Sequence, residues 1–147
     1  MNKIRQETGL VLPNIKAVKV IEGDPCCISS YKPYENSLYI SSKYFNSKNA
    51  IEDTLKDWSS NKIMPKQAKS IQFLAEHEAA HIRIPSDLLK SDEAYKLFKN
   101  RKLLNKNDLN INEYFADTTA IYRINSGTMS ANEIKVIEFL KKGGVKV

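Results

Sequence analysis

The hydrophobic pattern of the chain changes once, near residue 46, and this change limits the fold more than any other feature. Before it, residues 14–22 and 37–42 are rich in Val, Ile and Tyr, and residues 26–31 form a third such segment between turn sequences. After it, apolar residues recur with the 3.6-residue period of α-helices. Strands followed by helices predict an α+β fold with an N-terminal, mostly antiparallel sheet.

Five helices are expected in the second part of the chain. They are a helix over residues 50–58 marked by Ile51, Leu55 and Trp58, a long amphipathic helix between Pro65 and Pro85, a short one around residues 94–98, one from Ile111 to near Gly127, and one that begins with the capping-box sequence Ser130–Glu133 and ends at Gly143. We interpret Trp58 as a core residue. The strand at 37–42 alternates apolar and polar residues, which is typical of a half-buried strand.

Length and composition favour a single domain over residues 1–147 and exclude several classes of protein. The 147 residues carry a net charge of +6, but the lysines are scattered and no nucleic-acid-binding motif accompanies them, so we expect no nucleic-acid partner. No apolar run approaches the ~20 residues of a membrane span, and no signal peptide is recognisable. The two cysteines, Cys26 and Cys27, are adjacent, which excludes a disulfide scaffold and predicts one buried and one exposed thiol.

The long helix carries both histidines of the chain, in the sequence His77-Glu78-Ala79-Ala80-His81. Positions i and i+4 lie on the same face of a helix, so His77 and His81 can present ring nitrogens to one metal ion. Glu78 can reach a water on that ion without occupying a coordination position. Zinc lowers the pKa of such a water toward ~7, and a carboxylate base can complete its deprotonation. The pattern predicts a Zn²⁺ site with Glu78 as general base.

A catalytic zinc site has three protein ligands and an open position, and with no third histidine the remaining ligand must be a carboxylate. Glu113 is the first candidate because it belongs to a separate predicted helix. Glu93 is its main competitor, and Glu76 is less suitable because it lies on the helix of the two histidines. Asp117 is four residues after Glu113, and we expect it to accept a hydrogen bond from the non-ligating ring nitrogen of a histidine.

Taken together, the His77–His81 motif and Glu113-Tyr114-Phe115-Ala116-Asp117 resemble the zincin metallopeptidases, in the gluzincin form whose third ligand is glutamate. The Glu-x-x-Ala-Asp form is similar to the compact ImmA/IrrE-type peptidases of phages and mobile elements. The resemblance covers about residues 37–123, although Ala80 stands where many members have glycine. It implies a small zincin-like domain with His77, His81 and Glu113 as ligands, Glu78 as base and Asp117 as the residue that orients a ligand.

The expected function is that of a zinc-dependent endopeptidase acting on a protein or peptide substrate. By analogy with such folds, the strand at 37–42 is the candidate edge strand for an extended substrate. Donors considered for the oxyanion are Tyr34, Tyr44, Tyr114, Tyr122 and Arg123. The alternatives are a non-catalytic zincin-like binding module and a peptidase toxin or effector domain of a larger phage or secretion protein. We expect a cytoplasmic protein or one delivered in such an assembly, without membrane contact and in an oligomeric state that the sequence leaves open.

Overall fold

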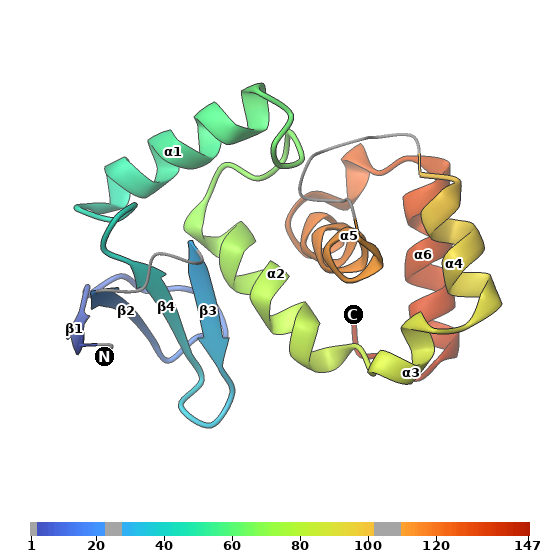
Figure 1. Ribbon diagram of the computed structural model, residues 1–147, viewed down its shortest axis with the longest axis horizontal. Coiled ribbons are helices and arrows are strands. Elements are labelled where there is room, and N and C mark those ends of the chain that lie inside the picture. Colours follow the sequence, from blue (N-terminus) through green and yellow to red (C-terminus); the bar gives the residue numbers. More distant parts are fainter. Residues whose placement is uncertain (1–2, 23–27, 102–109) are drawn as a thin grey trace.

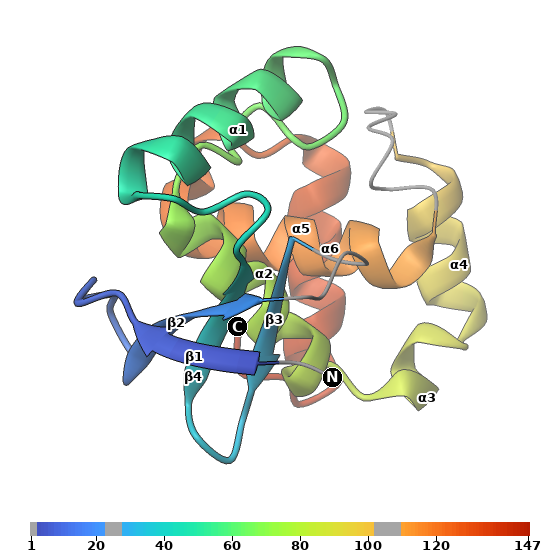
Figure 2. The same cartoon turned by 60° about the vertical axis from the view of Figure 1, so that its left-hand side comes forward.

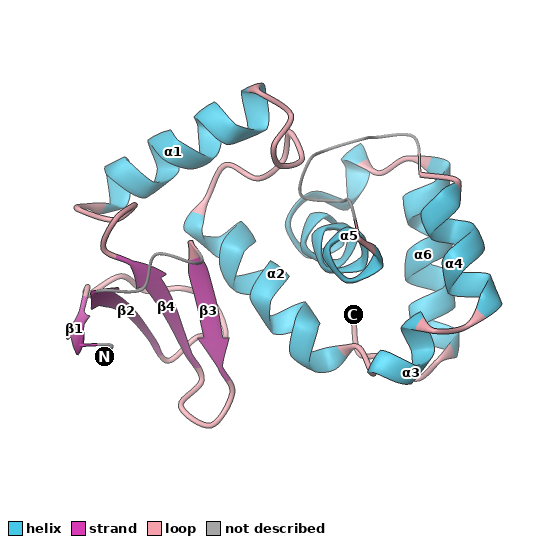
Figure 3. Cartoon of the chain, viewed as in Figure 1, coloured by secondary structure: helices cyan, strands magenta, loops and turns pink. Residues whose placement is uncertain are grey.

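Strands occupy the first part of the protein and helices the rest, so the expected α+β fold is confirmed (Figure 3). The computed structural model describes residues 3–22, 28–101 and 110–147. Its elements are β1 (Lys3–Glu7), β2 (Ala17–Glu22), β3 (Ser29–Lys32), β4 (Ser37–Ser41), α1 (Lys48–Ser60), α2 (Ile71–Arg83), α3 (Ser86–Leu89), α4 (Asp92–Lys99), α5 (Ile111–Asn125), a 3₁₀ turn (Ser126–Thr128) and α6 (Ala131–Lys142).

The four strands form one sheet in the order β1-β2-β4-β3. β1 pairs with β2 and β3 with β4 in antiparallel fashion, whereas β2 and β4 are parallel, so the sheet is mostly antiparallel as expected. Sequence reasoning missed β1 because its sequence KIRQE has one apolar residue among charged and polar ones and therefore no alternating pattern. β2 begins at Ala17 rather than at residue 14, since Asn14 has a positive φ of 64°.

β4 is an interior strand, which corrects the expectation of a half-buried edge strand at residues 37–42. All five residues of β4 are buried because β2 and β3 pair along its two sides. Leu38 and Ile40 face the hydrophobic core and are fully buried. Tyr39 points to the opposite face, where its hydroxyl donates to the Glu35 carboxylate at 2.6 Å and the Lys32 ammonium lies 4.5 Å from its ring centroid.

The helix that carries the histidines begins later than the position of Pro65 indicated. The Ser70 hydroxyl accepts a hydrogen bond from the Phe73 amide at 3.2 Å and caps the first turn of α2. Residues 65–70 form turns instead, although Ala68 still packs in the core. Ile82, in the last turn of α2, is 55% exposed.

Two hydrophobic clusters hold the molecule together, and the helices α2 and α5 contribute to both. The first cluster packs the sheet and α1 against Leu74 and Ala75 of α2 and the second half of α5. The second packs Ala80 of α2 and the first half of α5 against α4 and α6. Figures 1 and 2 show α2 beside β3, and α5 between α2 and the pair formed by α4 and α6. α2 and α5 make the most extensive contact between helices.

The ends of the last helix agree with the sequence pattern. The Ser130 hydroxyl accepts from the Glu133 amide, and the Glu133 carboxylate accepts from the Ser130 amide, which completes the predicted capping box. Gly143 follows the helix, and Gly144 has a positive φ of 84°. Within the described ranges, no helix is both long and apolar enough to cross a membrane. Cys26 and Cys27 lie outside the described residues.

We predict that Ala80→Leu destabilises the protein. Ala80 is fully buried in the second cluster with Ala116, so a larger side chain would force α2 and α5 apart. Overpacking of this kind costs roughly 1–3 kcal/mol of unfolding free energy. Urea denaturation checks the value, with Ala131→Leu as the control, because Ala131 is exposed on α6. Equal stability of the two variants would contradict the close packing of α2 on α5.

Candidate metal centre

The structure places both histidines on the face of α2 that meets α5. His77 is buried and His81 is half-buried, one helical turn further on. Their Nε2 atoms lie 3.2 Å apart, and their rings meet edge to face with centroids 4.8 Å apart. The expected convergence of the two ring nitrogens is therefore present.

Glu113 reaches both histidines from the first turn of α5. The Asn110 side chain accepts a hydrogen bond from the Glu113 amide at 3.0 Å and fixes the start of this helix. The two Glu113 carboxylate oxygens lie 3.0 Å from Nε2 of His77 and 3.3 Å from Nε2 of His81. The three residues form the one group in the described parts of the chain that could hold a metal ion, with one ligand atom from each within 4.8 Å of the others.

The spacing and chemistry of these atoms fit a zinc ion. Bonds of about 2.0–2.1 Å in a tetrahedron place neighbouring ligand atoms about 3.3–3.4 Å apart. The two histidine Nε2 atoms are 3.2 Å apart, and each lies 3.0–3.3 Å from one of the two Glu113 carboxylate oxygens. Two imidazoles and one carboxylate are ligands that zinc accepts. Two ring nitrogens and a carboxylate point their lone pairs at one another here. Because these lone pairs repel, the arrangement requires a proton or a metal cation between them.

Asp117 holds His77 from the other side of the ring. Its carboxylate lies 2.6 Å from Nδ1 of His77, and both side chains are almost fully buried. This contact matches the predicted hydrogen bond, and it leaves Nε2 of His77 to face Glu113. Burial disfavours the charged imidazole, but Asp117, Glu113 and Glu78 together hold the pKa of His77 well above its ordinary value.

Glu78 borders the ligand group without belonging to it. Its nearest carboxylate oxygen is 3.9 Å from Nε2 of His77, beyond hydrogen-bond distance. The Ser29 hydroxyl of β3 donates to the same oxygen at 3.3 Å. Burial raises the pKa of Glu78, although the two histidines act in the opposite direction. A raised pKa makes a carboxylate a stronger base, which suits a group that takes up and releases a proton.

Of the carboxylates considered as third ligand, Glu113 is the one that the structure places against both histidines. Glu93 lies exposed in the first turn of α4 and is not part of the ligand group, so the contact with the histidines is made by Glu113. Glu76 is buried elsewhere on α2 and is committed to two arginines. Its carboxylate lies 2.6 Å from Nε of Arg123 on α5 and 3.5 Å from a guanidinium nitrogen of Arg83. This ion pair joins the two helices that supply the ligands.

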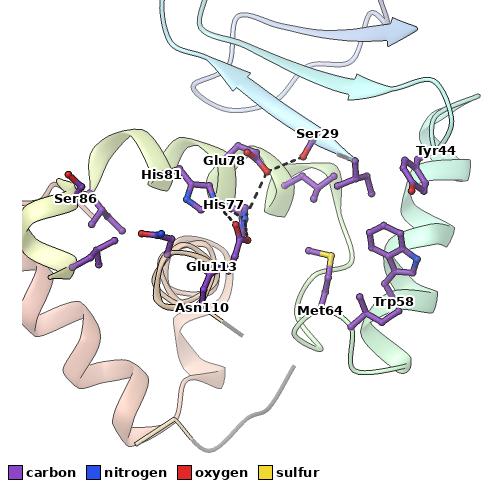
Figure 4. Close-up of a pocket in the computed structure, with 16 residues that line it drawn as sticks. Ser29, Tyr44, Trp58, Met64, His77, Glu78, His81, Ser86, Asn110 and Glu113 are labelled. Carbon is purple, nitrogen blue, oxygen red and sulfur yellow. Dashed lines mark hydrogen bonds and ion pairs between the residues drawn. The ribbon is translucent and has the colours of Figure 1, made fainter. Parts of the chain in front are cut away.

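A cavity of about 770 Å³ opens onto the three ligand residues and Glu78 (Figure 4). Of the residues considered as oxyanion donors, only Tyr44 lines it. Tyr34 is fully exposed, and Arg123 pairs with Glu76. The Tyr114 hydroxyl accepts a hydrogen bond from the side-chain amide of Asn132. Tyr122 is not among the lining residues.

Sequence reasoning did not assign Ser29, Trp58, Met64 or Asn110 to the site, although all of them line the cavity. Two of them have an identifiable signal: Asn110 has the N-cap spacing to Glu113, and Ser29 faces inward because side chains alternate along β3. Trp58 and Met64 also line the cavity. Trp58 is half-buried rather than a full core residue, and no pattern distinguished it from Ile51 and Leu55 on the same helix face.

Comparisons with known protein families, with curated proteins and with solved structures found no match to this chain. The chemistry of the site therefore rests on its own geometry.

We predict that Glu113→Ala abolishes tight zinc binding and that Glu93→Ala does not. Loss of a residue that merely supports a ligand costs about 10–100-fold in metal affinity, so loss of a ligand should cost more than about 100-fold. Competition with a chromophoric chelator measures the affinity. Glu93 is an exposed glutamate of α4 and serves as the matched control. Unchanged affinity in Glu113→Ala would show that Glu113 is not a ligand.

We also predict that zinc affinity rises with pH through neutrality. Because the pKa of His77 is raised, its ring in the metal-free protein keeps its proton to higher pH than an ordinary histidine, and zinc must displace that proton. The affinity should increase by up to about tenfold per pH unit for each proton released. In Asp117→Asn the proton is held less firmly, so the rise should level off at lower pH. A wild-type affinity that is constant above about pH 6.5 would contradict the raised pKa.

Proposed function

We propose that the protein is a zinc-dependent endopeptidase with His77, His81 and Glu113 as metal ligands. The observation that carries the proposal is the position of Glu78, which lies beside a group of three ligands, outside it, and on a large open cavity. Three protein ligands and a free coordination position are the arrangement of catalytic zinc sites. The cavity volume of about 770 Å³ lies in the range of substrate-binding clefts.

The proposed mechanism assigns one role to each side chain. His77, His81 and Glu113 would hold a zinc ion, which would supply Lewis acidity to polarise a carbonyl and to make a water more acidic. Glu78 takes a proton from the attacking water and returns it to the amine that leaves when the peptide bond breaks. Ser29 orients the Glu78 carboxylate through its hydrogen bond. Asp117 holds the His77 ring in the tautomer whose Nε2 faces the site.

A non-catalytic zinc module is the main alternative, and two features speak against it. Structural zinc sites are closed by four protein ligands, whereas among the residues that the structure describes three converge, beside a cavity. Glu78 is also placed in a largely buried position that raises its pKa, although a structural site has no use for such a carboxylate. A role as a toxin or effector domain is compatible with the same site, but no described feature favours it.

The strand that lies beside the site is β3 and not the strand at residues 37–42. β3 forms one edge of the sheet, contacts α2 and supplies the Ser29 contact to Glu78. β4 already pairs on both sides and has no free edge for a substrate. An extended substrate that adds to this sheet near the zinc site would therefore pair with β3.

We predict that Glu78→Gln stops peptide cleavage without removing zinc. Glutamine preserves the shape of the side chain but cannot accept the proton, so the cleavage rate should fall by about 10²–10⁴-fold. Zinc-loaded wild type and variant are incubated with a mixed peptide library, cleavage is followed by mass spectrometry, and bound zinc is measured in parallel.

The control is Glu138→Gln, an exposed glutamate of α6, which should cleave like wild type. If wild type binds zinc and cleaves nothing, the protein is a binding module. If the Glu78 variant cleaves as fast as wild type, Glu78 is not the base.

A further inference from the structure

One end of the cavity at the metal centre has an aromatic wall. Ile51, Leu55 and Trp58 follow one face of α1, but only the first two are fully buried, while Trp58 is half-buried and lines the cavity. Tyr44 packs edge to face against it, with ring centroids 5.4 Å apart and planes at 75°. This T-shaped pair holds both rings in fixed orientations.

The floor beneath these rings is apolar. Met64 and Leu74 are buried to 4% and 1% exposure, and Ile28 and Ile63 are partly buried beside them. None of these four side chains carries an ionisable group. Among the described residues, the ionisable side chains that line the cavity near the zinc ligands are His77, Glu78, His81 and Glu113, which all belong to the metal centre. Lys43 lies near the Tyr44 ring, at 5.4 Å from its centroid, but it is exposed and is not a lining residue.

This apolar end is continuous with the metal centre. Both belong to one cavity, and Leu74 is one helical turn before His77 on α2. Ile28 directly precedes Ser29, whose hydroxyl contacts Glu78. Figure 4 shows Tyr44, Trp58 and Met64 gathered on one side of His77 and Glu113, with Ser86 and Asn110 on the other side. A group bound at the metal can therefore extend a neighbouring substituent over the apolar floor.

We propose that this end, formed by Ile28, Tyr44, Trp58, Ile63, Met64 and Leu74, binds a large apolar side chain, aromatic or long aliphatic, next to the bond that is cleaved. The inference rests on the proposed peptidase function and names its substrate class. A large apolar side chain gains the free energy of leaving water for the apolar floor. A charged side chain would lose hydration there without gaining an ionic partner among the described residues of this end, and a small one would leave the rings without contacts.

Hydroxamates test the apolar end without requiring catalysis. The hydroxamate group binds zinc, so acetohydroxamate and phenylalkyl hydroxamates with one, two or three methylenes differ only in what they place beside the metal. An aminoalkyl hydroxamate of matching length supplies the charged counterpart. Trp58 is the only tryptophan of the chain, so its fluorescence reports occupation of this end directly. Calorimetry on the zinc-loaded protein gives the affinities.

We expect the best phenylalkyl ligand to bind on the order of 10–100-fold more tightly than acetohydroxamate, with a change in Trp58 emission. The aminoalkyl ligand should gain nothing. We call the ratio of the affinity of the best phenylalkyl ligand to that of acetohydroxamate the phenyl advantage. Trp58→Leu should reduce this ratio severalfold, measured by calorimetry. Phe98→Leu, which alters a partly buried aromatic residue of the second cluster away from the cavity, should leave that advantage unchanged.

The inference is overturned if wild type binds acetohydroxamate, the phenylalkyl hydroxamates and the aminoalkyl hydroxamate with equal affinity. This comparison uses wild type alone, so it does not depend on whether a variant folds. An unchanged phenyl advantage in a folded Trp58→Leu protein overturns the role of Trp58. These results are distinct from failure of the proposed function. A protein that prefers phenylalkyl hydroxamates but cleaves no peptide keeps its apolar binding site and loses its assignment as a peptidase.

Discussion

The contact between α2 and α5 is the constraint on which the site depends. His77 and His81 come from one helix and Glu113 and Asp117 from the other, so the distance between the helices sets how closely the two carboxylates approach the histidines. Small residues at this contact, among them Ala80 and Ala116, allow the backbones to approach closely. The Glu76–Arg123 ion pair adds a polar link between the same two helices. Packing and electrostatics thus act on the same geometry that the metal requires.

The sequence predicted those parts of the protein whose causes are local. The helical spacing of His77 and His81 follows from the period of one helix, and the capping box of α6 involves neighbouring residues only. Choosing Glu113 over Glu93 required the distance between helices, which no short pattern contains. The N-cap spacing from Asn110 was the available local signal, because it places Glu113 in the first turn of α5.

Errors of prediction arose where long-range contacts decide the outcome. The alternation in β4 correctly identified a strand, but its interior position depends on β2 and β3 pairing along both sides. Trp58 has the spacing of a core residue, yet it is only half-buried, because the face of α1 that carries it also borders a cavity. An apolar stripe therefore reports which face of a helix is covered, but not whether protein or a ligand covers each residue.

The pair formed by His77 and Asp117 lies where the two hydrophobic clusters meet. On α2, His77 stands between Ala75 of the first cluster and Ala80 of the second, and on α5, Asp117 lies between Ala116 and Ala120 in the same way. If one helix slid along the other by a turn, the hydrogen bond between His77 and Asp117 would break, and one of the two groups would be buried against apolar side chains. That group would lose its partner without regaining water. The pair therefore fixes the register of the helices, even before any ion is bound.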